Sequence, residues 1–492
     1  MDYAALILTC LKPLIAIGLP FAILPLLIVM ERRGAAFIQD RPGPNRAGIN
    51  LSLGNILGAL LFKESAIKAI FSATPPVDGV RLRGFGLIFN ATDGIKGFFK
   101  QSFTPPFAHR WYYIIAPALP ICTALLSTAI LPWFGPITFN TPNNGITTVS
   151  GQALDADAGL LVLFAIGSLG VYGIVLGSWA SNSKFSLLGG MRASAMMISY
   201  EVSMGLSALG VILLVGSFDL TAIVAWQTEH TWGIVAQPIG FLLFFTAIFA
   251  ECNRTPFDVI EGDSEIVAGF HTEYGSGKFL AFMSGEYTHV VVASALVATL
   301  FLGGYSLLPF PLPLNGLGES WVSLNTLWLR DHLGLMGAIV LAGMGVLALG
   351  FAWLVNKRRV WYGTLIKATD RTARVREYGF YSLVFALAGL GFLLAAGIAA
   401  WLGNPTALAG IHDKGAPVHA LWVGLAVAAI QVGVVMGKTF LLSWVFVWVR
   451  WTLPRFRYDQ IMALGWKVLL NLAILNLLIT AVLVKAFGGH HG

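Results

Sequence analysis

Acidic side chains gather in one stretch of this chain, Ala250–Lys278, which lies between two long apolar runs. The whole sequence has 24 acidic residues, and this stretch holds Glu251, Asp258, Glu261, Asp263, Glu265 and Glu273. Carboxylates that lie close together raise one another's pKa, and burial raises it further, so such a cluster can hold protons near neutral pH and pass them on. These residues therefore favour proton transfer as the chemistry of the stretch.

The spacing of these acids also has a structural explanation. Asp258, Glu261 and Glu265 stand at i, i+3 and i+7, so they share one face if the segment is helical. Pro256 would suit the first turn of that helix, and acids near a helix N-terminus are favoured by the macrodipole. A solvated helix start explains Asp258 better than the later acids, and burial of the cluster decides between the two interpretations.

Glu201 stands alone within the apolar segment "ASAMMISYEVSMGLSALGVILLVG". A charged carboxylate at the centre of a membrane helix costs about 2.5–3.5 kcal/mol, so Glu201 should be neutral, paired or in a wet cavity. The alternative is a residue near enough to the inner membrane surface to reach water. Glu251 and Glu286 border apolar runs, and for them an interfacial position competes evenly with a buried, proton-carrying role.

Two segments combine basic residues with proline, glycine or aromatic residues. The segment "ERRGAAFIQDRPGPNRAG" holds Arg32, Arg33, Arg41 and Arg46, and "WVRWTLPRFRYDQ" holds Arg450, Arg455 and Arg457. Proline and glycine indicate ordered turns. The ordinary excess of positive charge on the inner side of a membrane explains the charge of these segments but not their rigidity.

Signals for other chemistries are missing from the sequence. There is no P-loop, GxGxxG, HExxH or Ser/His/Asp pattern. Cys10, Cys122 and Cys252 are far apart without CxxC spacing, so we expect neither a metal site nor an iron–sulfur cluster. Any redox chemistry must then use a diffusible or partner-bound group. His271 is isolated, and a packed role is favoured over catalysis.

The composition shows what must position these residues. The chain is 57% hydrophobic and 11% charged, against about 25% charged in a typical soluble domain. Apolar runs near twenty residues predict membrane-spanning helices, so we expect an all-α polytopic bundle in one integral membrane domain, 1–492. The predicted spans are 13–31, 111–131, 158–178, 196–216, 236–251, 288–305, 335–355, 380–402, 419–449 and 461–485.

The distribution of lysine and arginine predicts the orientation of these spans. With both termini outside, the inside segments and their flanks hold 26 of the 31 basic residues. These inside segments are 32–110, 179–195, 252–287, 356–379 and 450–460. Residues 93–103 of the first segment predict an amphipathic helix on the membrane surface. The seven basic residues of 356–379 fit either the ordinary charge bias or contact with anionic lipid or a partner.

Lys438 lies within an apolar run, twelve residues before Arg450. At 1.5 Å per residue it lies about 18 Å deeper than the inside boundary. It either approaches the opposite surface or finds a partner within the bundle.

Five blocks taken together resemble a known family. The blocks "ERRGAAFIQDRPGPNRAG", "DGIKGFFKQSFTPPFAHR", "SNSKFSLLGGMRASAMMISYEV", "AECNRTPFDVIEGDSEIVAGFHTEY" and "TLPRFRYDQIMALGWK" are similar to the H subunit of respiratory complex I. The mitochondrial counterpart in this family is NADH dehydrogenase subunit 1. The resemblance covers roughly 1–48, 84–305 and 419–485.

The resemblance implies a membrane-arm subunit of a proton-pumping NADH:quinone oxidoreductase in a prokaryotic inner membrane. Such a subunit forms the entrance of the quinone chamber, and its inside loops pack against the hydrophilic-arm quinone-reducing subunits. Neighbouring membrane-arm subunits and lipid are the other implied partners, and no nucleic acid is expected. Quinone is then the substrate, while NADH, FMN and iron–sulfur clusters belong to partner subunits and no cofactor belongs to this chain.

The resemblance also implies roles for matching residues. The implied proton path is Glu201, Glu251, Glu261, Asp263, Glu265 and Glu273. The residues implied to line or order the quinone chamber and its entrance are Arg32, Arg41, Arg46, Asp93, Arg254, Phe257 and Asp258.

This chain departs from the family pattern in several places. Gln101 stands where glutamate is usual, so no charged role is carried over there, and Cys252 replaces a common threonine. Two segments, 49–83 and 306–418, are expected to be insertions, and the second adds two spans to the usual eight. An inserted pair preserves the orientation of the spans that follow.

Other functions compete with this one. The equivalent subunit of a membrane-bound hydrogenase, or of a related ion-translocating oxidoreductase, would share these blocks without binding quinone. A stand-alone secondary transporter is disfavoured because we find no internal repeat. A purely structural membrane anchor leaves Glu201 and the acidic cluster unexplained.

Overall fold

The computed structural model describes most of the chain. The described residues are 3–41, 43–44, 47–52, 68, 80–141, 145–259, 263–308, 326–365, 368–403, 412–413, 416–417 and 421–487. The chain divides into two compact units. We call Met1–Leu27, Lys96–Trp328 and Leu408–Gly492 the bundle unit, and Ile28–Ile95 with Leu329–Ala407 the hairpin unit.

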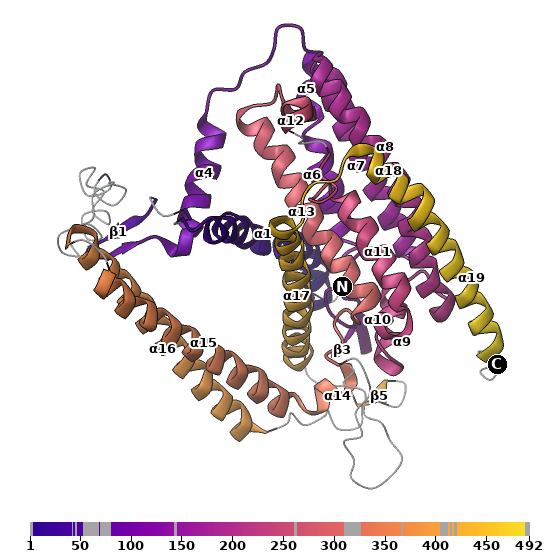
Figure 1. The fold of residues 1–492 in the computed structure, drawn as a ribbon. Coiled ribbons are helices and arrows are strands. Elements are labelled where there is room, and N and C mark those ends of the chain that lie inside the picture. Colours follow the sequence, from indigo (N-terminus) through magenta and orange to yellow (C-terminus); the bar gives the residue numbers. More distant parts are fainter. Residues whose placement is uncertain are drawn as a thin grey trace. The chain divides into compact units, whose positions relative to one another are not determined.

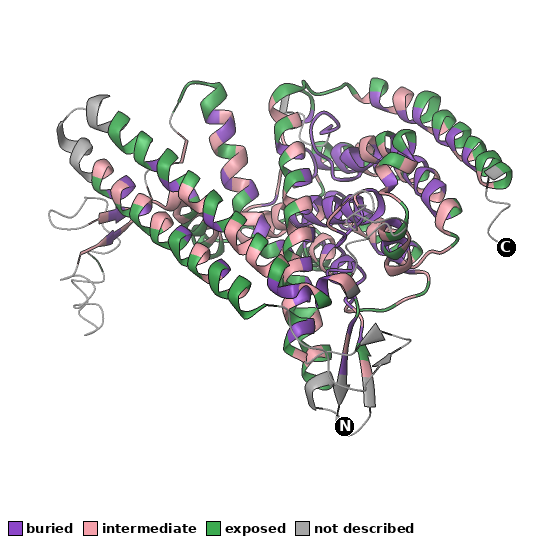
Figure 2. Ribbon diagram, turned by 90° about the horizontal axis from the view of Figure 1, so that it is seen from below, coloured by how far each residue is buried: buried purple, intermediate pink, exposed green. Residues whose placement is uncertain are grey.

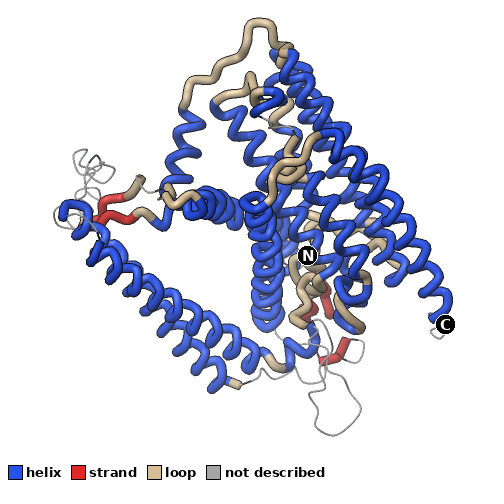
Figure 3. Tube along the Cα trace, viewed as in Figure 1, coloured by secondary structure: helices blue, strands red, loops and turns tan. Residues whose placement is uncertain are grey.

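The bundle unit is built from helices (Figures 1 and 3). They are α5 (Arg110–Ile115), α6 (Ala118–Thr128), α7 (Gly159–Ala180), α8 (Lys184–Val215), α9 (Leu220–Glu229), α10 (Gly233–Ala236), α11 (Pro238–Glu251), α12 (Asp263–Ile266), α13 (Ser276–Phe301), α17 (Leu421–Thr452), α18 (Tyr458–Ala463) and α19 (Leu470–Phe487). A π-helical segment, Leu464–Leu469, joins α18 to α19. Two short strand pairs also belong to this unit, β3 (Ile137–Thr141) with β4 (Gly145–Val149) and β5 (His412–Asp413) with β6 (Ala416–Pro417).

The hairpin unit is centred on two long helices, α15 (Leu333–Leu365) and α16 (Ala368–Leu402), which pack against each other. Strand β2 (Val80–Leu82) pairs with β1 (Ile49–Leu51) and contacts α16. A 3-10 turn, Gly84–Gly86, follows β2. The boundary between the units falls within α1 (Tyr3–Ile38), α4 (Leu87–Phe99) and α14 (Thr326–Asp331).

The predicted membrane bundle is confirmed. Nine helices in the described part of the chain are long and apolar enough to span a membrane, and the apolar α11, of 14 residues, accounts for the tenth predicted span. The helices extend beyond several predicted spans: α8 begins at Lys184, where 196 was predicted. The surface helix predicted at 93–103 is α4, which begins earlier and ends at Phe99.

Small residues let the bundle helices approach closely, as is typical of membrane proteins. A Cβ on Gly173 of α7 would lie 2.6 Å from Pro120 of α6. A Cβ on Gly189 of α8 would lie 2.7 Å from the Cα of Gly269, so the loop before α13 packs directly on α8. Buried residues concentrate in the bundle unit, whereas α15 and α16 carry many exposed apolar side chains (Figure 2).

Segments predicted to lie on the same side of the membrane contact one another within the bundle unit. The His109 amide donates to the Ala180 carbonyl at 2.9 Å, and Ser186 Oγ donates to the Phe270 carbonyl at 2.9 Å. The Phe456 amide donates to the Pro256 carbonyl at 3.0 Å. These contacts agree with the predicted alternation of the spans. The assignment of this end to the inside stays a prediction from the charge count.

Candidate functional site

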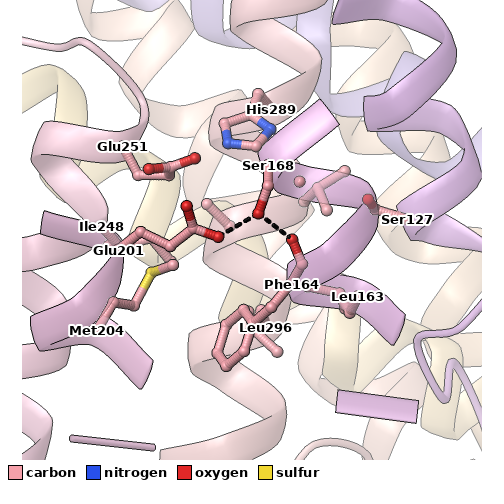
Figure 4. A pocket seen from close by; sticks show the side chains of 13 residues that line it. Ser127, Leu163, Phe164, Ser168, Glu201, Met204, Ile248, Glu251, His289 and Leu296 are labelled. Atoms are coloured by element: carbon pink, nitrogen blue, oxygen red, sulfur yellow. Dashed lines mark hydrogen bonds between the residues drawn. The ribbon is translucent and has the colours of Figure 1, made fainter. Parts of the chain in front are cut away.

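A pocket inside the bundle unit brings together groups that can carry protons (Figure 4). Glu201 from α8, Glu251 from α11 and His289 from α13 line it, together with Ser168 from α7. The remaining lining is Ser127, Leu163, Phe164, Gly167, Met204, Ile248, Val292, Ala293 and Leu296. The cavity volume is about 30 Å³, which is room for about two water molecules.

Glu201 is half-buried and bonds to Ser168. Ser168 Oγ lies within hydrogen-bond distance of Glu201 Oε1 and also 2.9 Å from the Phe164 carbonyl oxygen. A hydroxyl has one proton to donate. When Ser168 donates that proton to the Phe164 carbonyl, Glu201 can bond to Ser168 Oγ only as a donor, which requires a protonated carboxyl group. This arrangement can therefore accommodate Glu201 in both protonation states.

Glu251 is the last residue of α11 and its side chain is buried. Its Oε2 has no hydrogen-bond partner among the described residues. A buried ionised carboxylate without partners is costly, so this oxygen needs a proton or a water molecule. The pocket that it lines can supply the water.

His289 is a member of this pocket that the sequence did not single out. It lies on α13, three residues after Glu286. Its imidazole lines the same pocket as the carboxylates of Glu201 and Glu251 (Figure 4). The available signal was an imidazole within the apolar run that follows Tyr287. That signal alone does not identify the partners, because those come from α8 and α11.

The first part of the acidic stretch is buried and held in place by its own side chains. Asp258 forms an ion pair with Arg455 at 3.0 Å, and Phe257 packs edge-on against Tyr200 at 5.4 Å. The Arg254 guanidinium lies 4.1 Å from the centre of the Tyr287 ring. These residues, expected at the quinone chamber, anchor the loop to the bundle.

A helix start at Asp258, one of the two interpretations of the acidic spacing, does not form in the described residues. Asp258 lies outside any helix, and between α11 and α13 the only helical turns in the described residues are α12 and the 3-10 turn Gly269–His271. Backbone hydrogen bonds from 253 to 259 form turns instead, with Phe257 N donating to Arg254 O at 2.9 Å. Pro256, whose carbonyl accepts from the Phe456 amide, therefore belongs to this turn and not to the start of a helix.

The later acids of the stretch have different environments. Glu265 is exposed and pairs with Arg192 at 2.6 Å. Glu273 is half-buried, and its carbonyl accepts from the Tyr113 hydroxyl at 2.6 Å. Asp263 begins α12, and Glu261 lies outside the described residues. Burial raises the pKa of the neighbouring Tyr274 phenol, which therefore stays neutral and donates to the Gly177 carbonyl at 3.3 Å.

Two of the residues expected at the quinone entrance meet in the hairpin unit. Arg32 Nη1 lies 2.5 Å from the Asp93 carboxylate, and the guanidinium also lies 5.4 Å from the centre of the Phe89 ring. Arg41 is exposed and donates to the Gln39 side chain at 2.7 Å. Arg46 lies outside the described residues.

Lys438 finds its partners within the bundle unit. Its Nζ donates to the carbonyls of Leu302, Gly304 and Ser306 at 2.6, 2.9 and 2.5 Å. These carbonyls follow the C-terminus of α13, where a cation is favourable. Lysine at this position therefore stabilises the loop at the end of the bundle opposite the acidic stretch.

No group of His, Cys, Asp or Glu side chains in the described residues is placed to hold a metal ion. Cys10 and Cys122 are exposed and Cys252 is buried.

Comparison with known proteins gives a consistent family. A family model described as NADH dehydrogenase matches residues 11–481. The chain is 31% identical to the NADH-quinone oxidoreductase H subunit of Flavobacterium psychrophilum, over 93% of this chain and 91% of that protein. It is 32% identical to the H subunit of the same enzyme from Bdellovibrio bacteriovorus, over 94% of this chain and 91% of that protein. The identity to an H subunit from Solibacter usitatus is 33%, over 97% of this chain and 96% of that protein.

Proposed function

This chain belongs to the NADH dehydrogenase family, and we propose that it couples quinone reduction to proton translocation as a membrane-arm subunit of a proton-pumping NADH:quinone oxidoreductase. Its relatives carry the name of that enzyme's H subunit. Nine long apolar helices in the described residues agree with a multi-pass protein of the bacterial inner membrane.

The pocket of Glu201, Glu251 and His289 is the observation that carries the proposal. Two carboxylates in one small, mostly apolar pocket repel each other when both are ionised, so the pair favours a shared proton. The hydrogen bonds of Ser168 suit Glu201 with or without its proton. His289 offers a third group that accepts and releases a proton, and two waters would bridge the three.

The rest of the acidic stretch would connect this pocket to the quinone. In the proposed path, protons pass between the pocket and Glu261, Asp263, Glu265 and Glu273. Phe257 and Asp258 fix the start of the loop, which directly follows Glu251. A change in charge near the loop would therefore change the environment of Glu251. Arg32, Arg41, Arg46, Asp93 and Arg254 would order the quinone entrance.

The chemistry would be divided among subunits. Quinone is the substrate, and the electrons come from NADH through FMN and iron–sulfur clusters that partner subunits hold. The inside loops of this chain would pack against the hydrophilic-arm quinone-reducing subunits, and other membrane-arm subunits would receive the protons. This chain contributes proton-carrying side chains and the wall of the quinone chamber.

Glu201→Gln tests the proposal in the assembled complex. The amide keeps an acceptor for Ser168 but cannot release a proton, so we expect NADH-driven proton translocation to fall at least about tenfold. Translocation and quinone reduction are measured in sealed membrane vesicles, with co-purification of the partner subunits as the check on assembly. The matched control is Glu229→Gln, which changes an exposed acid at the end of α9. Full coupled turnover in assembled Glu201→Gln complex would overturn the proposal.

A further inference from the structure

A second pocket lies within the hairpin unit, where three arginines meet. Arg33 comes from α1, Arg83 from the segment between β2 and α4, and Arg374 from α16. The rest of the lining includes Glu377, Tyr378 and Tyr381, also from α16. Arg374, Glu377, Tyr378 and Tyr381 follow i, i+3, i+4 and i+7, so one face of α16 forms this wall.

The single carboxylate of the pocket already has its donors. Glu377 Oε2 lies 3.3 Å from Arg83 Nη1, and Glu377 Oε1 accepts from the Arg83 amide at 2.8 Å and from the Tyr381 hydroxyl at 2.9 Å. The pocket lining therefore holds three guanidinium groups and one carboxylate, and that carboxylate is paired with Arg83.

Two of these guanidinium groups have donors to spare. The Nε atoms of Arg33 and Arg83 are buried and make no hydrogen bond within the described residues. The Arg33 guanidinium is also held in place, since it lies 5.9 Å from the Phe37 ring centre and 6.0 Å from that of Phe85. Buried, unused N–H donors on fixed arginines point to a ligand that supplies acceptor oxygens.

Phosphate oxygens are the acceptors that suit this arrangement, because the planar guanidinium fork matches a phosphate group. An exposed apolar side chain adjoins the pocket: Phe37 of α1 is 54% exposed, and its ring centre lies 5.9 Å from the Arg33 guanidinium. A ligand with a phosphate at one end and acyl chains at the other would satisfy both features. The predicted orientation places these arginines on the inner face, where anionic lipids attract basic residues.

We propose that the pocket of Arg33, Arg83 and Arg374 binds the phosphate headgroup of an anionic membrane lipid. The bound lipid would join α1, the segment before α4 and α16 at one point. It would lie beside Arg32, the neighbour of Arg33 and the partner of Asp93. This binding does not require the proton pathway, so the two proposals can fail independently.

Lipid retention tests the proposal in the purified complex. The complex is delipidated, reconstituted into nanodiscs of phosphatidylcholine with a minor fraction of phosphatidylglycerol, and examined for retained lipid by native mass spectrometry. Arg33→Gln and Arg374→Gln should each lower retained phosphatidylglycerol about tenfold. Arg376→Gln, which changes an exposed arginine of the same helix, should leave retention unchanged.

Two further measurements decide whether the phosphate comes from a lipid and whether the guanidinium geometry is needed. Arg33→Lys keeps the charge without the fork, and we expect retention between that of the wild type and Arg33→Gln. Excess inorganic phosphate should not displace the lipid. Equal retention in wild type and Arg33→Lys, Arg33→Gln and Arg374→Gln would overturn the proposal, as would displacement by inorganic phosphate, which would identify a site for free phosphate.

Discussion

Two buried glutamates meet opposite environments in the two units. Glu251 is 5% exposed and Glu377 is 3% exposed, so burial does not distinguish them. Glu377 accepts from the Arg83 side chain, the Arg83 amide and the Tyr381 hydroxyl. Glu251 leaves Oε2 without a hydrogen-bond partner in the described residues and shares its pocket with a second carboxylate.

The difference predicts which buried carboxylate serves stability and which serves the proposed chemistry. A buried carboxylate with a full set of donors has satisfied oxygens, and removing it leaves its partners unpaired. A buried carboxylate without donors costs stability and gains from binding a proton. Glu377 therefore belongs to the first kind and Glu251 to the second, and variants of each should change different measurements.

The largest expected effect comes from comparing two acids of the same stretch. Glu251→Gln should lower proton-coupled quinone reduction at least about tenfold, because the amide cannot carry a proton in the pocket. Glu265→Gln should lower it about two- to threefold, since exposed Glu265 pairs with Arg192 and water can replace it. Turnover is measured in vesicles with assembled complex. A greater loss for Glu265→Gln would break the ordering by burial.

Glu377→Ala should lower the free energy of local unfolding around Arg83 by about 3 kcal/mol, because it leaves Arg83 without its buried partner. The amides of Arg83 and Gly84 lie beside Glu377 and Tyr381, so they report the change directly. Hydrogen exchange of these amides, followed by mass spectrometry of the complex, should accelerate about a hundredfold. Glu377→Gln keeps an acceptor and serves as the matched control. Unchanged protection in Glu377→Ala would contradict a stabilising role.

The sequence predicted the helices far better than the side-chain contacts between them. All ten predicted spans lie on helices because an apolar run of sufficient length is a local property. Glu201 was found the same way, since a charge within such a run is visible without any contact. Its position beside Glu251 was not visible, because that depends on how α8 packs against α11.

The misses share one physical cause, which is that side-chain partners come from distant segments. His289 is one imidazole in an apolar run until α8 and α11 place carboxylates beside it. Glu377 was not singled out in the sequence, because its bonds to Arg83 span 294 positions of the chain. The spacing of Asp258, Glu261 and Glu265 left a helix start open, and it could not show that Asp258 pairs with Arg455 outside any helix.

Lys438 extends the comparison to a cation, and its variant should have the smallest effect. Three backbone carbonyls satisfy Lys438, so it resembles Glu377 and should serve stability. Lys438→Met leaves those carbonyls without their donor and should lower the free energy of opening the 302–306 loop by about 1–3 kcal/mol. Faster hydrogen exchange of the Leu302 and Gly304 amides measures this, with Lys485→Met, which changes an exposed lysine, as control.

Since Lys438 lies at the end of the bundle opposite the acidic stretch, coupled turnover should be retained. A loss of translocation with unchanged exchange would instead assign this lysine to the proton path.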